Sequence, residues 1–187
     1  MRWIPFLILT YVVVLLQTSL VGLITFHFGS IGTVGPDLLA IAAVYVVMHA
    51  RYGLDAMLAV WVLGLAADLT AGGGTAGLTA VGPMSIAYVV GGGAVYSIRE
   101  AFFRDRASTK VILALLFCSL AHFVWVSLQS LLAWRAMTGA AYGAMLLQAL
   151  MLSVYTAALM PLAYFPLSRV GSFILASPTG RPRRYYR

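Results

Sequence analysis

The chain has little charge: only 9% of its 187 residues are Asp, Glu, Lys or Arg, whereas about 25% is usual in soluble domains. Hydrophobic residues make up 62% of it, and the mean hydropathy is +0.96. So few polar side chains cannot cover a water-soluble globule, and so high a hydrophobicity excludes a disordered chain. The composition therefore predicts an integral membrane protein with one membrane domain and little mass outside it.

Acidic residues and cysteine are also scarce. There are 5 Asp and Glu against 12 Lys and Arg, and Cys118 is the only cysteine. One thiol supports neither a disulfide framework nor a cysteine-based metal site. In so apolar a chain, the positive excess indicates contact with anionic lipid headgroups rather than with nucleic acid. We expect no metal site, because the histidines fall on different predicted spans, and we also expect no cofactor.

The longest stretches without charge predict helices that cross the membrane. A helix needs about 20 apolar residues to span the hydrocarbon core, and four charge-free stretches exceed this length. The predicted spans are Ile4–Phe26, Ala76–Ile98, Val111–Trp134 and Gly143–Leu167.

Two shorter apolar arms, Pro36–Ala50 and Leu54–Thr70, lie between the first two of these spans. One continuous helix would place Arg51 and Asp55 near the middle of the bilayer, which is costly for each charge. A hairpin that turns at Tyr52–Gly53 places both at the surface instead. We therefore predict an all-α, polytopic membrane protein with six transmembrane helices in one bundle.

The distribution of positive charge predicts the orientation. With six spans, every Lys and Arg except Arg135 falls on the same side as both termini, and such a bias marks the cytoplasmic side. We divide the chain into a transmembrane domain at residues 1–170 and a cytoplasmic basic-aromatic tail at residues 171–187. The basic residues expected at the membrane surface are Arg99, Arg104, Arg106, Lys110, Arg181, Arg183 and Arg184.

Two acids are expected at the outer ends of adjacent helices. Pro36 and Asp37 open the arm Pro36–Ala50, the second of the six predicted spans in chain order. A proline fits the first turn of a helix, and an aspartate there faces the positive end of the helix dipole. Asp68 ends the third span, where the dipole disfavours an anion, so we expect a functional or an interhelical role for it. Gly72 and Gly73 follow in a tight reversal. These five residues are the candidates for binding a partner or lining an outward-facing concavity.

Other polar side chains fall inside the spans and must turn away from lipid. Helical spacing places His122 and Gln129 on one face of the fifth span. We expect the set to form hydrogen bonds between helices, with a ligand pocket as the alternative. Its members are Gln17, His122, Gln129, Gln148 and Tyr155.

Small residues mark the fourth span. Gly82-Pro83 predicts a kink in it. Gly91, Gly92 and Gly93 predict a face on which another helix of this chain, or of a partner, packs closely.

No catalytic constellation is evident in the sequence. Ser119 and His122 lie three residues apart on one helix, but nothing orients the histidine and no oxyanion hole is apparent. We therefore predict that the chain is not an enzyme.

The order of three motifs resembles the rod shape-determining membrane protein family MreD. The first is Leu15-Leu16-Gln17-Thr18-Ser19-Leu20, the second is Pro36-Asp37-Leu38-Leu39 leading to Val44-Tyr45-Val46, and the third is Gly64-Leu65-Ala66-Ala67-Asp68-Leu69. The resemblance covers residues 9 to 106. Gly91–Gly93 and the basic-aromatic tail depart from the family pattern, and the second half matches only in hydropathy.

The resemblance implies a multi-pass protein of the bacterial inner membrane without catalytic activity. Its expected partner is an MreC-like single-span coiled-coil protein, and the indirect partners are MreB, RodA and a class B transpeptidase. The family is also similar to the six-helix substrate-binding subunits of energy-coupling-factor transporters. That similarity implies an alternative function, the capture of a vitamin-like small molecule. Self-association as a homodimer stays open.

Overall fold

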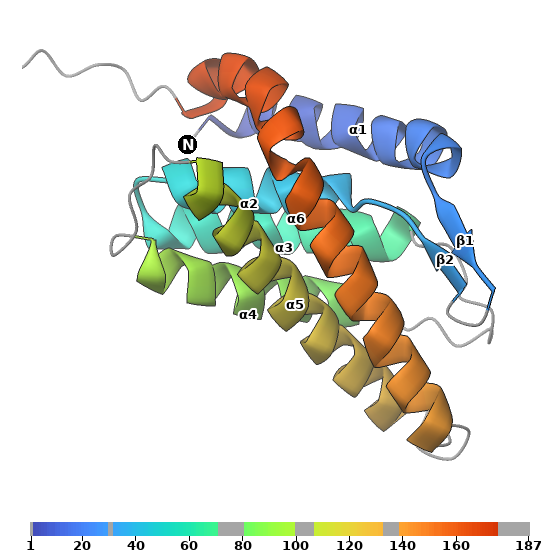
Figure 1. Cartoon of the computed structure of the whole chain (residues 1–187). Helices are drawn as coiled ribbons and strands as arrows, with labels where there is room; N and C mark the ends of the chain where they lie inside the picture. The colour runs from blue at the N-terminus through green and yellow to red at the C-terminus, as the bar shows by residue number, and fades with distance from the viewer. Residues whose placement is uncertain (1, 30–31, 71–80, 100–106, 133–138, 176–187) are drawn as a thin grey trace, which may run out of the picture.

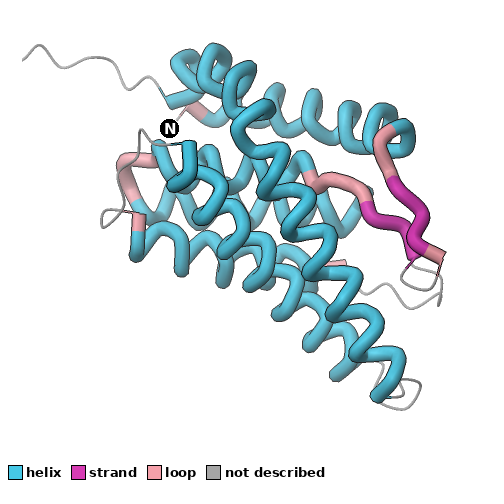
Figure 2. The backbone as a smooth tube through the Cα atoms, in the orientation of Figure 1, coloured by secondary structure: helices cyan, strands magenta, loops and turns pink. Residues whose placement is uncertain are grey.

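The computed structural model describes residues 2–29, 32–70, 81–99, 107–132 and 139–175. Within them the chain forms six α-helices, which are drawn with their order in Figure 1. The helices are α1 (Trp3–Leu20), α2 (Leu38–His49), α3 (Gly53–Thr70), α4 (Pro83–Ile98), α5 (Ala107–Leu132) and α6 (Gly139–Leu175). A short 3-10 turn, η1 (Val21–Leu23), and a hairpin of β1 (Phe26–Phe28) and β2 (Gly32–Val34) complete the described part; Figure 2 shows the hairpin in magenta.

Four of the helices are long and apolar enough to cross a membrane. The candidate spans are Trp3–Leu23, Gly53–Thr70, Ser108–Leu132 and Ala141–Gly171. Helices α2 and α4 are also apolar but shorter, with 12 and 16 residues. Many large apolar side chains of the long helices are exposed, as a lipid-facing surface requires. The predicted helical fold is thereby confirmed, and four of its helices have the length and composition of membrane spans.

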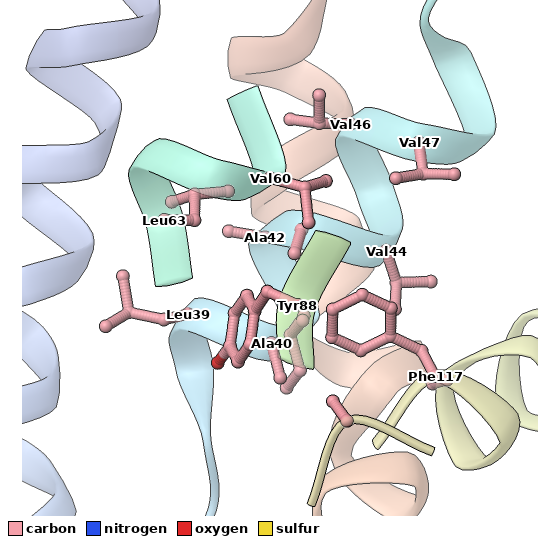
Figure 3. Packing of buried hydrophobic residues seen from close by; sticks show 14 of the residues in the cluster. Leu39, Ala40, Ala42, Val44, Val46, Val47, Val60, Leu63, Tyr88 and Phe117 are labelled. Carbon is pink, nitrogen blue, oxygen red and sulfur yellow. The ribbon is translucent and has the colours of Figure 1, made fainter. Parts of the chain in front are cut away.

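Helix α2 lies at the centre of the bundle. It contacts each of the other five α-helices, and every side chain from Leu39 to Met48 is buried. Figure 3 shows Ala42, Val44 and Val46 of α2 among the buried side chains of its neighbours. Because α2 has apolar neighbours on all sides, its sequence is apolar all round, and it shows no polar face.

The bundle has two distinct ends. Helix α1 begins and α6 ends at one end, which we call the terminal end, and the hairpin lies at the other, the hairpin end (Figure 1). Helix α6 contains Pro161 and Pro166, and Figure 1 shows it changing direction toward its carboxyl end. A proline removes one helical hydrogen bond and bends the helix. The helix continues to Leu175, past the domain boundary expected at residue 170, and the rest of the expected tail lies outside the described residues.

The hairpin corrects the first predicted span, which was expected to run to Phe26. Helix α1 ends at Leu20, and Phe26 pairs with Val34 in an antiparallel register. Gly32 adopts φ +95°, a left-handed conformation that other residues rarely take, so the glycine permits the reversal. The short apolar run after residue 23 therefore forms a strand instead of a last helical turn.

The kink expected at Gly82-Pro83 is also wrong, because these residues begin a helix. Gly82 is the N-cap of α4 with φ +126°, and Pro83 occupies its first turn. Proline suits this position because its missing N–H would have no partner within the helix.

Glycines bring α4 close to its neighbours. A Cβ atom on Gly91 would lie 3.1 Å from the carbonyl oxygen of Phe117 in α5, and one on Gly92 would lie 3.1 Å from the Val60 side chain in α3. The small-residue face of the fourth span is therefore used within this chain.

Candidate functional site: a cavity lined by Asp37 and Asp68

A cavity of about 350 Å³ opens at the hairpin end of the bundle. Its walls come from the end of α1, the hairpin segment, the start of α2, the end of α3, the start of α4 and the middle of α5 and α6. Asp37 and Asp68 both line it, so the structure brings together the two acids that the sequence placed at the ends of adjacent helices. The other polar residues of its wall are Gln17, Thr18, Thr25, Thr33, Thr70, His122 and Trp125.

Asp37 is buried, and each of its carboxylate oxygens accepts a hydrogen bond. Its Oδ1 accepts the Ala40 N–H at 3.0 Å, which caps α2, and its Oδ2 accepts the Tyr88 hydroxyl at 2.6 Å. Its own N–H donates to Thr156 Oγ1 at 3.0 Å. In Figure 3 the Tyr88 ring stands beside Leu39 and Ala40, with its oxygen turned toward the segment that leads into α2. The expected helix cap is present, and it also joins α2 to α4 and α6.

Asp68 is half-buried and caps a helix that is not its own. Its Oδ2 accepts the N–H groups of Gly82 at 2.9 Å and Ser85 at 3.2 Å, and its Oδ1 accepts that of Met84 at 3.2 Å. The Ser85 hydroxyl adds a fourth contact at 3.3 Å. The carboxylate thus satisfies N–H groups that the first turn of any helix leaves unpaired, and it faces the positive end of α4. Of the two roles expected for Asp68, the structure shows the interhelical one.

Gln17 holds the chain as it enters α2. Its Oε1 accepts the Leu38 N–H at 2.8 Å and its Nε2 donates to the Pro36 carbonyl at 3.3 Å. Both ends of the side-chain amide are therefore used. Gln17 is an interhelical polar contact, as the sequence predicted, and it places Pro36 and Asp37 at the cavity wall.

His122 contributes a buried ring to the cavity and is only 5% exposed. Its Nδ1 lies 2.7 Å from the Cys118 carbonyl oxygen and 3.2 Å from Ser153 Oγ of α6. A carbonyl oxygen can only accept, so Nδ1 carries the proton, and Nε2 of the neutral ring is an acceptor. His122 therefore also makes the predicted contact between helices.

Gln148 and Tyr155 hold the hairpin rather than another helix. Gln148 Nε2 donates to the Thr33 carbonyl at 2.8 Å, and the Tyr155 hydroxyl donates to the Ile24 carbonyl at 3.1 Å. The interhelical role predicted for these two residues is wrong, because β1 and β2 occupy the space beside α6. Gln129, the remaining member of the set, is half-buried in α5 and makes no hydrogen bond to any described residue.

Two predicted surface cations are engaged at the terminal end. Arg99 is only 4% exposed, and its Nη1 donates to the carbonyls of Val47 at 2.6 Å and Ala50 at 2.7 Å. Its guanidinium lies 3.9 Å from the Tyr96 ring centroid. The surface position expected for Arg99 is wrong: the side chain caps α2, whose final carbonyls attract a cation.

Lys110 also contacts an aromatic ring, with its Nζ 3.5 Å from the Tyr164 centroid. The other predicted binding and basic residues, Gly72, Gly73, Arg104, Arg106, Arg181, Arg183 and Arg184, lie outside the described residues.

A second hollow is an apolar groove of about 200 Å³ between α1 and α6. Helix α1 contributes Leu9, Val12, Val13 and Leu16, and α6 contributes Ala163, Pro166, Leu167 and Val170. Leu38 and Ile41 of α2 complete the lining, so every side chain of the groove is apolar.

Sequence reasoning missed the partners of the acids and of His122. Tyr88, Thr156 and Ser153 are all buried, and each completes a hydrogen bond from a helix distant in sequence. A hydroxyl inside an apolar helix is a signal in itself, because a buried O–H needs a partner. Among the described residues no group of three or more His, Cys, Asp or Glu could hold a metal ion.

Comparison with protein-family models, with curated proteins and with solved structures finds no match to this chain.

Proposed function

We propose that this chain is a non-catalytic scaffold of the bacterial cell-shape and elongation machinery. In this proposal it crosses the inner membrane six times with both termini in the cytoplasm. It pairs with an MreC-like single-span protein and, through it, with MreB, RodA and a class B transpeptidase. The motif order described above supports the family. The apolar groove between α1 and α6 supports the pairing.

The groove fits a transmembrane helix of such a partner. Helix α1 is the least enclosed of the four long helices, with 17% of its apolar stretch buried. Its exposed side chains next to the groove include Val12 and Leu16, at 43% and 39% exposure. Association between helices in lipid depends on packing into complementary shapes, and a groove beside an open helix face offers such a shape.

The partner test places a large side chain in the groove. Val12→Trp should fill it and abolish co-purification of the coiled-coil partner in detergent, whereas Ile8→Trp should leave co-purification intact. Ile8 is the matched control because it lies on α1, is 60% exposed and does not line the groove. Equal pull-down by both variants would remove the groove from the partner interface.

Depletion in the native host tests the function itself. A scaffold predicts that depleted cells round or swell and that the elongation machinery disperses, without vitamin auxotrophy. Normal cell shape after depletion would overturn the proposal.

The six-span topology has a separate test by cysteine labelling. Single cysteines at Thr33, Thr75 and Thr138 should react from outside, and one at Ser108 should react from inside. The natural Cys118 is buried and gives no background in the folded protein. Labelling of Ser108→Cys from outside would contradict the topology.

The cavity favours a second candidate function, the capture of a vitamin-like small molecule for transport. Its volume of about 350 Å³ lies within the range of about 300–1,000 Å³ that ligand sites occupy. Mass spectrometry of the purified protein distinguishes the two. A stoichiometric vitamin together with normal cell shape on depletion would favour transport.

A further inference from the structure

The polar groups around the cavity carry a net negative charge. Asp37 and Asp68 accept hydrogen bonds only from neutral donors, and no Lys or Arg of the described chain pairs with either. Each carboxylate accepts N–H groups at a helix N-terminus, which contributes about half a positive charge, but Asp68 itself lies in the last turn of α3, whose C-terminus contributes about half a negative charge. Two carboxylates, two helix N-termini and the C-terminus of α3 therefore leave about one to two negative charges at the cavity wall.

One of the ring nitrogens at the cavity wall is an acceptor without a partner among the described residues. His122 is only 5% exposed, and its Nε2 makes no hydrogen bond to any described residue. With the proton on Nδ1, this nitrogen presents a lone pair. Gln17 Nε2 donates one of its two N–H groups to the Pro36 carbonyl. A ligand group that donates a hydrogen bond matches this nitrogen.

The cavity wall also contains an aromatic side chain that can attract a cation. Trp125 lines the cavity from α5, the helix that also carries His122. The face of an indole ring attracts a cation, and the attraction is larger where water is excluded.

We propose that this cavity binds an organic cation through a primary ammonium or guanidinium group. Both groups are donor-only and carry a positive charge, which this negative wall attracts. The carboxylates, His122 Nε2 and the Trp125 ring supply the acceptors and the aromatic face. The inference rests on the cavity alone and not on the scaffold function. It also names a ligand class for the second candidate function.

Calorimetric titration of the purified full-length protein tests the charge requirement. Butylammonium and butylguanidinium are the probes, and butanol is the neutral control of similar shape. We expect both cations to bind and butanol not to bind. Absence of binding by either cation to folded protein, or equal binding of butanol, would overturn the proposal.

Two variants place the binding in this cavity. Asp68→Asn should weaken butylammonium binding about tenfold to hundredfold, because a charge-assisted hydrogen bond is lost. Asp55→Asn, which changes an acid at the opposite end of α3, should leave the affinity unchanged. Unchanged affinity in Asp68→Asn would overturn the proposal.

Trp125→Leu covers the case in which Asp68→Asn fails to fold. Butylammonium should alter tryptophan fluorescence in the wild type and lose that effect in Trp125→Leu. Persistence of the full fluorescence change in this variant would put the ligand elsewhere and overturn the assignment.

The amine can come from a free molecule or from a lipid headgroup, and the bilayer composition distinguishes these sources. Nanodiscs of phosphatidylcholine are compared with nanodiscs containing phosphatidylethanolamine. Competition by phosphatidylethanolamine against butylammonium identifies the headgroup, and equal affinity in both identifies a free amine. If no cation binds, the ligand proposal fails, but the coiled-coil partner should still co-purify. The ligand proposal and the scaffold proposal are therefore tested separately. If the purified protein contains a neutral or anionic vitamin, the transport function remains a candidate, and only the proposal of a cationic ligand is overturned.

Discussion

The hydroxyl of Tyr88 in α4 donates to Oδ2 of Asp37 over 2.6 Å, and both residues are buried. The same aspartate caps α2 through its Oδ1 and reaches Thr156 of α6 through its N–H. One carboxylate therefore fixes the entry of the central helix relative to two of its neighbours.

Removal of the Tyr88 hydroxyl tests this connection. Tyr88→Phe should lower the free energy of unfolding in mild detergent by about 1.5–3 kcal/mol, because the buried carboxylate loses its donor. Tyr52→Phe is the control, since Tyr52 is 59% exposed and its change should stay within about 0.5 kcal/mol.

A double-mutant cycle separates this bond from other effects of the substitution. Tyr88→Phe and Asp37→Asn should be less destabilising together than the sum of the two single changes, because they remove one interaction. Strict additivity would show that the bond contributes nothing of its own.

Asp68 should matter to stability through the helix that it caps. Asp68→Ala leaves the first N–H groups of α4 without their acceptor and should cost about 2 kcal/mol, at the upper end for a lost cap. Asp68→Asn keeps a side-chain oxygen and should cost less. Ser97→Ala, which removes only a bond to the Gly93 carbonyl within α4, is the control. Equal unfolding curves for the alanine variant and the wild type would refute the capping role.

The helices of this protein were predictable because long apolar runs between charges are a strong signal. The joint position of Asp37 and Asp68 was predictable too, since each ends one of two adjacent antiparallel helices. The hairpin was not, because a short apolar run such as the one beginning at Phe26 fits a helical turn and a strand equally well. The strand is favoured only by its position beside Gln148 and Tyr155, which hold this segment by hydrogen bonds in the packed bundle.

The partners of the polar residues were beyond the reach of the sequence for a different reason. Asp68 contacts the backbone of Gly82, Met84 and Ser85, and backbone donors carry no mark in the sequence. Arg99 follows an apolar run and so reads as a cation at the membrane surface. Its burial depends on the position of the last carbonyls of α2, which only the packed bundle defines.

Arg99 offers a test at the terminal end of the bundle. Arg99→Met keeps an apolar stem but removes the donors to Val47 and Ala50, and it should lower the free energy of unfolding by about 1.5–3 kcal/mol. Arg51→Met removes an exposed cation and should change it by about 0.5 kcal/mol or less. An equal effect of the two substitutions would return Arg99 to the surface role predicted from the sequence.

The close approach of α3 and α4 gives the sharpest comparison, because two glycines undergo the same chemical change. A Cβ atom on Gly64 would lie 2.7 Å from Ser85 Cα and 2.9 Å from the Met84 carbonyl oxygen. These are backbone atoms, so no side-chain rotation relieves the clash, and α4 must move away from α3. Gly64→Ala should therefore lower the free energy of unfolding by about 1–3 kcal/mol.

Gly93→Ala, in α4, is the matched control for Gly64→Ala. Its Cβ would meet only the Met57 sulfur at 4.0 Å, an ordinary contact. Alanine favours a helix over glycine by up to about 1 kcal/mol, so Gly93→Ala should be neutral or stabilising. Both substitutions carry the same helix preference, and the difference between their unfolding free energies therefore isolates the packing of α3 against α4. If the two variants unfold alike, the backbone contact at Gly64 does not hold these helices together, and the N-terminus of α4 depends on Asp68 alone.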